Sequence, residues 1–164
     1  MKPESGSQEV HVARLQSGSE DDVIRVLIAD SNAAVRRGLR SLLSSARGIE
    51  VSGEATNSTE TLSLLGTGTH DVALLDVSIC GVPGLGMLEQ IRIDKYPVAV
   101  IVMSTYEEAR LVRRALDLGA AGYLSKRHAA EEVAEAIKTV SAGRVSVTRA
   151  LLTPLKRIQA EGQS

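Results

Sequence analysis

Four polar groups of different chemistry follow short apolar stretches at separate places in the chain. Asp30, Asp76 and Ser104 each come directly after such a stretch, and Lys126 comes after one with a single serine between. A Gly/Pro-rich loop follows Asp76, as is typical where a buried strand ends. Two acids, a hydroxyl and a lysine that leave separate strands form a constellation of groups rather than an isolated motif.

The position of these groups predicts that they meet at one edge of a sheet. Open α/β sheets place their chemistry at the carboxyl ends of their strands. Clustered carboxylates repel one another unless a cation lies among them, and an oxygen-rich cluster favours magnesium. A metal and Lys126 could together neutralise a phosphoryl group while it transfers to an oxygen of Asp76, which would act as the nucleophile and form an acyl phosphate.

The rest of the chain supplies the elements that such a site needs. Short apolar runs alternate with segments that carry apolar residues at three- and four-residue spacing, as in Val35, Leu39, Leu42 and Leu43. We predict strands over residues 24–29, 50–54, 72–75, 98–103 and 122–124, and helices over 33–46, 58–65, 84–93, 107–118 and 130–142. Five consecutive βα units predict a doubly wound α/β domain with a parallel sheet of strand order 2-1-3-4-5.

In this strand order the first and third strands are neighbours, so Asp30 and Asp76 should converge on one crevice. Ser104 and Lys126 should face Asp76 from the other side, because the fourth and fifth strands flank the third there. Asn32 and Ser58 can cap helix starts, and Gly119 and Gly143 follow predicted helix ends, which supports these boundaries.

Length and composition indicate a single domain with tails. The chain has 164 residues, of which 43% are apolar, enough for one hydrophobic core. Residues 1–22 are rich in Ser, Gly and Glu and are expected to form a disordered tail. The domain is expected over residues 23–143, and residues 144–164 are expected to be a linker or tail, with a helix over 147–158.

Charge and cysteine content limit the classes of partner and compartment. The net charge of -1 gives no overall attraction to nucleic acid or to an anionic membrane. The single cysteine, Cys80, excludes an intramolecular disulfide framework and is expected to be a small loop residue. No apolar run near the amino terminus is long enough for a signal peptide or membrane span. We therefore expect a cytoplasmic protein with no membrane contact.

Residues from about 24 to 143 resemble the receiver domain of a two-component response regulator, most closely of the NarL/FixJ type. The resemblance implies a flavodoxin-like (βα)5 fold, and it covers most of the predicted domain in the correct order. It is carried by residues 24–30, 35–39, 71–76, 118–126 and 132–143.

The resemblance implies a role for each group. Asp76 matches the aspartate that a histidine kinase phosphorylates, Ser104 the hydroxyl that bonds the phosphoryl oxygen, and Lys126 the conserved lysine of the family. Asp30 matches the first member of an acidic pair, and the magnesium ligands are expected at Asp30, Asp76 and Ser78. Tyr123 matches the aromatic switch residue, which turns inward in the family when the hydroxyl residue is drawn toward the phosphoryl group.

The resemblance also implies the activity and partners. We expect the chain not to be an enzyme: it should accept a phosphoryl group on Asp76 and at most catalyse its own dephosphorylation. The expected partners are a histidine kinase and a second copy of the chain. DNA is expected only through an output domain, because residues 144–164 are too short for a helix-turn-helix domain. The chain is thus expected to be either an excised receiver of a transcription regulator or a stand-alone receiver.

Three positions depart from the family's pattern. The second acid of the pair, a direct metal ligand, is Ser31 here, so the site is atypical and magnesium binding should be weakened or lost unless Asn32 or water compensates. The family's proline four residues after the acceptor is Cys80, and an acidic residue of the same loop is replaced by Pro83. These changes leave the geometry of that loop open.

Two other functions remain as alternatives. A phosphorylation-independent pseudo-receiver would serve as a protein- or ligand-binding or dimerisation module, and Ser31 and Cys80 favour it. A small-molecule enzyme or flavin carrier on the same fold is disfavoured by the lack of a phosphate-binding glycine loop, a nucleophile elbow or aromatic flavin platforms. The three histidines, His11, His70 and His128, share no metal-ligand spacing and are expected to be solvated.

Overall fold

The structure, a computed structural model, describes residues 22–80 and 85–162 of the chain. The predicted tail at residues 1–22 lies outside these ranges except for Asp22. The replacement at Pro83 and the predicted helix start at residue 84 also lie outside them. Within the described residues, no helix is long and apolar enough to cross a membrane.

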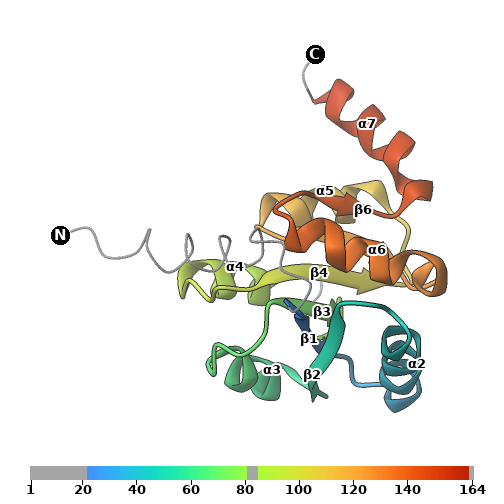
Figure 1. The fold of residues 1–164 in the computed structure, drawn as a ribbon. Coiled ribbons are helices and arrows are strands. Elements are labelled where there is room, and N and C mark those ends of the chain that lie inside the picture. The colour runs from blue at the N-terminus through green and yellow to red at the C-terminus, as the bar shows by residue number, and fades with distance from the viewer. Residues whose placement is uncertain (1–21, 81–84, 163–164) are drawn as a thin grey trace.

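The strands form one parallel sheet (Figure 1). Their order across it is β2-β1-β3-β4-β5-β6, so the predicted order 2-1-3-4-5 is confirmed and one further strand is added. Every pairing is parallel, and Asp76 lies opposite Met103 while Ser104 lies opposite Ser125. The strands are β1 (Ile24–Ala29), β2 (Ile49–Ala55), β3 (Val72–Asp76), β4 (Ala99–Ser104), β5 (Gly122–Ser125) and β6 (Ser146–Val147).

Helices cover both faces of the sheet, as two separate apolar clusters require. The first helices are α2 (Ala33–Ser44), α3 (Ser58–Leu65) and α4 (Gly86–Ile93), and they are followed by α5 (Ala109–Asp117) and α6 (Ala129–Ser141). Leu39 of α2 and Ile137 of α6 pack on one face, and Leu88 of α4 and Val112 of α5 pack on the other. Burial on both faces explains why the central strands are continuous aliphatic runs.

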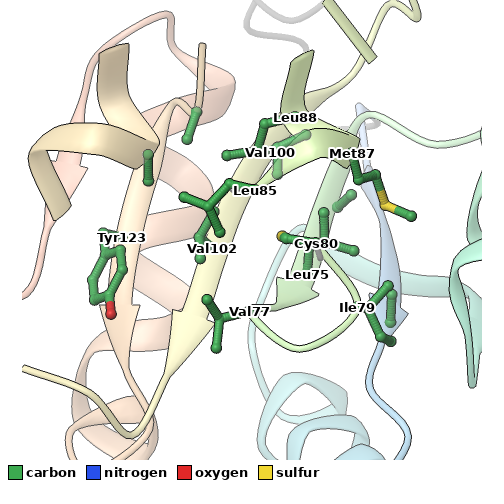
Figure 2. Close-up of a cluster of buried hydrophobic side chains, with 14 of the residues drawn as sticks. Leu75, Val77, Ile79, Cys80, Leu85, Met87, Leu88, Val100, Val102 and Tyr123 are labelled. Atoms are coloured by element: carbon green, nitrogen blue, oxygen red, sulfur yellow. The ribbon is translucent and has the colours of Figure 1, made fainter. Parts of the chain in front are cut away.

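The face that α4 and α5 cover also contains three residues of the loop that follows β3, namely Val77, Ile79 and Cys80. Figure 2 shows Ile79 and Cys80 near Leu75 of β3 and Met87 of α4, and Val77 on the side of Val102 of β4. Because these loop side chains are buried, the backbone directly after Asp76 is held against the sheet. The loop therefore positions Asp76 as well as connecting β3 to α4.

The segment predicted to be a linker or tail continues the folded structure. β6 pairs with the outer edge of β5, where the Ser146 N–H donates to the Ala121 carbonyl at 3.1 Å and the Thr148 N–H donates to the Tyr123 carbonyl at 3.0 Å. A short 3-10 turn, η1 (Arg149–Leu151), and helix α7 (Leu152–Glu161) follow. Leu151 and Leu155 are buried in the cluster that contains α5. Pairing satisfies the exposed edge of β5, and the two leucines anchor α7 beside α5.

The boundaries of several helices have local causes. Asn32 caps α2 as predicted, because its side chain accepts from the Ala34 N–H. Asn57, not Ser58, caps α3, by accepting from the Glu60 N–H at 2.8 Å. Gly119 and Gly143 follow α5 and α6 with φ of 105° and 83°, a left-handed conformation that favours glycine at helix ends.

Candidate functional site

The two predicted acids meet at the carboxyl edge of the sheet. Asp30 follows β1 and Asp76 ends β3, the neighbouring strand, and only 3% and 7% of their surfaces are exposed. The Lys126 Nζ lies 2.7 Å from Asp30 Oδ2 and 2.6 Å from Asp76 Oδ1. Three of the predicted site residues therefore form one ion-pair cluster, in which a single ammonium is shared by two carboxylates.

Lys126 remains charged in this position. Its partial burial disfavours the ammonium form, but the hydrogen bonds and the negative charges of Asp30 and Asp76 outweigh that effect. The pKa of Lys126 is consequently raised above its ordinary value. The cluster thus contains one ammonium, that of Lys126, and the two carboxylates of Asp30 and Asp76, so its net charge is negative.

Each acid also accepts a hydrogen bond from the backbone two residues farther along. The Asn32 N–H donates to Asp30 Oδ1 at 2.8 Å, and the Ser78 N–H donates to Asp76 Oδ2 at 3.1 Å. The Ser78 hydroxyl donates to the same oxygen of Asp76. Local turns thus orient both carboxylates before any ligand binds.

The predicted switch residues form a compact hydrogen-bonded group at the end of β4. Ser104 is fully buried, and its Oγ accepts from the Tyr106 N–H at 2.9 Å. Tyr123 is 1% exposed, and its hydroxyl donates to the Tyr106 carbonyl at 2.6 Å. Burial raises the pKa of Tyr123, and a hydrogen bond with Ser104 opposes that rise.

Figure 2 shows the Tyr123 ring alongside β5, with its hydroxyl directed toward the carboxyl ends of the strands. The ring is therefore inside the molecule, next to the loop that follows Ser104. This inward position is the one that the resemblance associates with the switched state.

The residues present match a magnesium site in kind but not in number. Asp30 and Asp76 offer the hard oxygen ligands that magnesium prefers. Ser31, where the resemblance leads us to expect a second acid, is an exposed, neutral residue. Among the residues that the structure describes, no group of three acids, histidines or cysteines could hold a metal ion. The described residues therefore bring two carboxylates, Asp30 and Asp76, to this edge of the sheet.

Two further sequence expectations can be compared with the structure. Cys80 is 1% exposed, and burial, with a smaller effect of the Asp76 charge, raises the pKa of its thiol to about 12. Such a thiol is a packing group and not a reactive one. The expectation that His70 is solvated is wrong: it is 4% exposed, and its Nδ1 lies 2.6 Å from Ser52 Oγ.

The sequence did not identify Glu107 and Ser125 as part of this region. The Ser125 hydroxyl donates to Glu107 Oε1 at 2.7 Å, joining the loop after β4 to the loop after β5. Eighteen residues separate the two in the chain. Their closeness in the sequence to predicted site residues could have indicated them: Glu107 lies three residues after Ser104, and Ser125 directly precedes Lys126.

Comparison with known proteins shows the family to which the chain belongs. A family model described as the response regulator receiver domain matches residues 26–138. The chain is 36% identical over 122 residues to the response regulator UvrY of Escherichia coli, covering 74% of this chain and 56% of that protein. It is 31% identical over 136 residues to the transcriptional regulatory protein NarL of Mycobacterium tuberculosis, covering 83% of this chain and 63% of that protein. The chain spans less than two thirds of these curated relatives.

Solved structures show the same architecture. The signal receiver domain of NarL from Mycobacterium tuberculosis has a TM-score of 0.69 and 32% identity, with 75% of this chain and 99% of that chain covered. RcsB of Salmonella typhimurium has a TM-score of 0.76 at 23% identity, with 86% of this chain and 69% of that chain covered. This likeness indicates a common fold. The flavodoxin-like fold is thus confirmed, and the chain belongs to the receiver domains of two-component response regulators, of the kind found in NarL and UvrY.

Proposed function

We propose that Asp76 accepts a phosphoryl group from a histidine kinase and that the phosphorylated receiver regulates transcription through a further part of a longer protein. The observation that carries this proposal is the contact between Asp76 Oδ1 and Lys126 Nζ at 2.6 Å, at the carboxyl end of β3. A lysine at this distance can neutralise charge on a transferring phosphoryl group.

In the proposed step, a carboxylate oxygen of Asp76 attacks phosphorus. The phosphorus–nitrogen bond of the kinase phosphohistidine breaks, its electron pair stays on the imidazole nitrogen, and an acyl phosphate forms on Asp76. The Lys126 ammonium stabilises the phosphoryl oxygens. The Ser104 hydroxyl donates a hydrogen bond to one of them. We propose no other enzymatic activity than this acceptance and self-dephosphorylation.

Receiver domains generally bind magnesium for phosphorylation. In this chain Asp30, Asp76 and Ser78 would hold the ion, which would supply positive charge to the phosphoryl oxygens. We propose that binding is weaker than in receivers with a complete acidic pair, because Ser31 provides no negative charge. Lys126 then contributes a larger share of the positive charge near Asp76.

Intact-mass spectrometry with acetyl phosphate tests the proposal. Incubation should add one phosphoryl group to the chain, more slowly or to a smaller extent without magnesium. Asp76→Asn should add none, and Asp117→Asn, which changes an exposed aspartate of α5, should behave as the unchanged chain does. This control separates loss of the acceptor from a general effect of removing an acid.

No addition to a folded chain, at any magnesium concentration, would contradict the proposal. That result would favour the pseudo-receiver that binds a protein or a ligand without phosphoryl chemistry. We also propose that the chain forms a homodimer, so that its second partner is another copy of itself. Light scattering after size-exclusion chromatography should show whether phosphorylation raises the molar mass of the particle.

A further inference from the structure

One contact outside the acid–lysine cluster joins the two loops that carry Ser104 and Lys126. The Ser125 hydroxyl, on a fully buried residue, donates to Glu107 Oε1 at 2.7 Å. The His128 Nε2 lies 3.4 Å from the same oxygen. The Glu107 side chain is 27% exposed, so this carboxylate lies at the edge of the protein interior rather than free in solvent.

Ser125 is fixed from its other sides, which makes it a rigid anchor for Glu107. Its N–H donates to Thr148 Oγ1 at 2.7 Å, and its Oγ accepts from the Arg127 N–H at 3.3 Å. The next residue, Lys126, donates its N–H to the Ser104 carbonyl at 2.8 Å. A buried hydroxyl needs an acceptor, and Glu107 is the acceptor that the structure gives to Ser125.

The loop after β4 is consequently held at two adjacent residues. Tyr106 is held by its carbonyl, which accepts from the Tyr123 hydroxyl at 2.6 Å. Glu107 is held by Ser125. If Glu107 were released, the Tyr106 carbonyl beside it could move away. The buried Tyr123 hydroxyl would then lose an acceptor, which would favour rotation of the ring out of the core.

We propose that Glu107 is a positioning residue that holds Tyr123 in its inward position in the absence of a phosphoryl group. It acts through Ser125 and the Tyr106 carbonyl and does not touch the phosphoryl group itself. The inference rests on the proposed function, since it assigns part of the phosphorylation switch to a side-chain contact already made in the unmodified chain. By tying the loops together, Glu107 also fixes Ser104 relative to Lys126.

Fluorine NMR of protein labelled with 3-fluorotyrosine provides a direct measurement. The chain has three tyrosines, so three resonances are expected, and each can be assigned by a Tyr→Phe variant. Without a phosphoryl donor, Glu107→Ala and Ser125→Ala should both shift the Tyr123 resonance toward that of an exposed tyrosine. The Tyr96 resonance should stay in place and reports that the fold is intact.

Two substitutions separate the contact from a general structural effect. Glu107→Gln should leave the Tyr123 resonance close to its original position, because the amide oxygen can still accept from Ser125. Glu108→Ala removes an exposed glutamate whose charge also acts on the Tyr123 hydroxyl but whose side chain makes no capping hydrogen bond to α5, so it should not shift the Tyr123 resonance toward that of an exposed tyrosine. The initial rate of Asp76 phosphorylation should fall on the order of tenfold in Glu107→Ala and recover in Glu107→Gln.

An unchanged Tyr123 resonance in both Glu107→Ala and Ser125→Ala would overturn the proposal. A Glu107→Gln variant that behaves like Glu107→Ala would overturn it as well. If Glu107→Ala does not fold, Ser125→Ala decides, because it removes the same bond from the other side. The NMR measurement needs no phosphoryl donor, so a failure of Asp76 to accept a phosphoryl group would refute the proposed function independently.

Discussion

The strand β3 has a buried aspartate at each end, and the two are bound in different ways. Asp71, directly before the strand, is fully buried and accepts from the Arg25 N–H at 2.8 Å and from its Nε at 3.3 Å. Asp76, at the other end, is 7% exposed and is bound by Lys126 and Ser78. The backbone of the neighbouring strand β1 thus holds Asp71, whereas loop residues hold Asp76.

The balance of charge also differs between the two ends. Arg25 pairs with Asp71 at the amino edge, whereas Lys126 is shared by Asp30 and Asp76 at the carboxyl edge. The excess negative charge at the carboxyl edge suits a site that receives a cation or a phosphoryl group. Both aspartates are buried and ion-paired, so these two properties do not distinguish them; the ratio of cations to carboxylates does.

The largest expected effect is on stability and separates these two aspartates. Asp71→Ala should lower the free energy of unfolding by about 2–4 kcal/mol, because it leaves the Arg25 N–H and guanidinium without their buried acceptor. Asp76→Ala should change the free energy of unfolding by less than about 1 kcal/mol. Lys126 retains its ion pair with Asp30, and the exposed Ser78 can form hydrogen bonds with water instead of with Asp76. Urea unfolding measures both; equal losses would remove the distinction between the two ends.

The second expectation concerns the two cations. Lys126→Met should lower stability at neutral pH by roughly 1–2 kcal/mol, because it leaves Asp30 and Asp76 without the charge that they share. Magnesium should restore part of this loss by binding the folded state. Arg25→Met, at the amino end of β3, removes the cation that pairs with Asp71. Only one carboxylate is affected there, so magnesium should not restore the stability of this variant. Thermal unfolding with and without magnesium compares the variants, and rescue of both would argue against a specific site.

The residues that the sequence predicted well are those fixed by backbone topology. Aliphatic runs and helical spacing predicted alternating strands and helices, and right-handed crossovers then favoured the strand order that brings Asp30 next to Asp76. Lys126 then follows from the position of β5. Periodicity predicts these features because a parallel sheet buried on both faces leaves few alternative arrangements.

The residues that the sequence did not predict are those whose environment depends on side-chain contacts. His70 is expected in solvent but is buried against Ser52, a contact between the strand β2 and the segment that precedes β3. The polar segment after α6 gave no indication that Ser146 would pair with β5, since a two-residue strand has no measurable period. Glu107 resembled any exposed glutamate at a helix start.

A third prediction tests whether Ser31 stands at a position where a charged residue would bind magnesium. Ser31→Asp should tighten magnesium binding by roughly tenfold or more, because it places a charged oxygen ligand next to Asp30. Asn32→Asp adds the same charge one residue farther along and keeps the cap of α2, so it should change the affinity much less. Isothermal titration calorimetry measures both. Equal gains in the two variants would indicate a general charge effect and not a ligand position.

The smallest expected effect lies at the amino edge, in the pH dependence of stability. Burial, aided by the nearby Arg25 charge and opposed by that of Asp71, lowers the pKa of His70. Between pH 7 and the lowered pKa, the unfolded chain, with its ordinary pKa of about 6.5, binds a proton that the folded chain does not. Stability is therefore full above about pH 6.5 and falls as the pH decreases through this window. His70→Gln should remove that slope while running parallel to the unchanged chain above pH 7. Urea midpoints measured across this range test the prediction: an identical slope in His70→Gln would show that other groups cause the acid sensitivity.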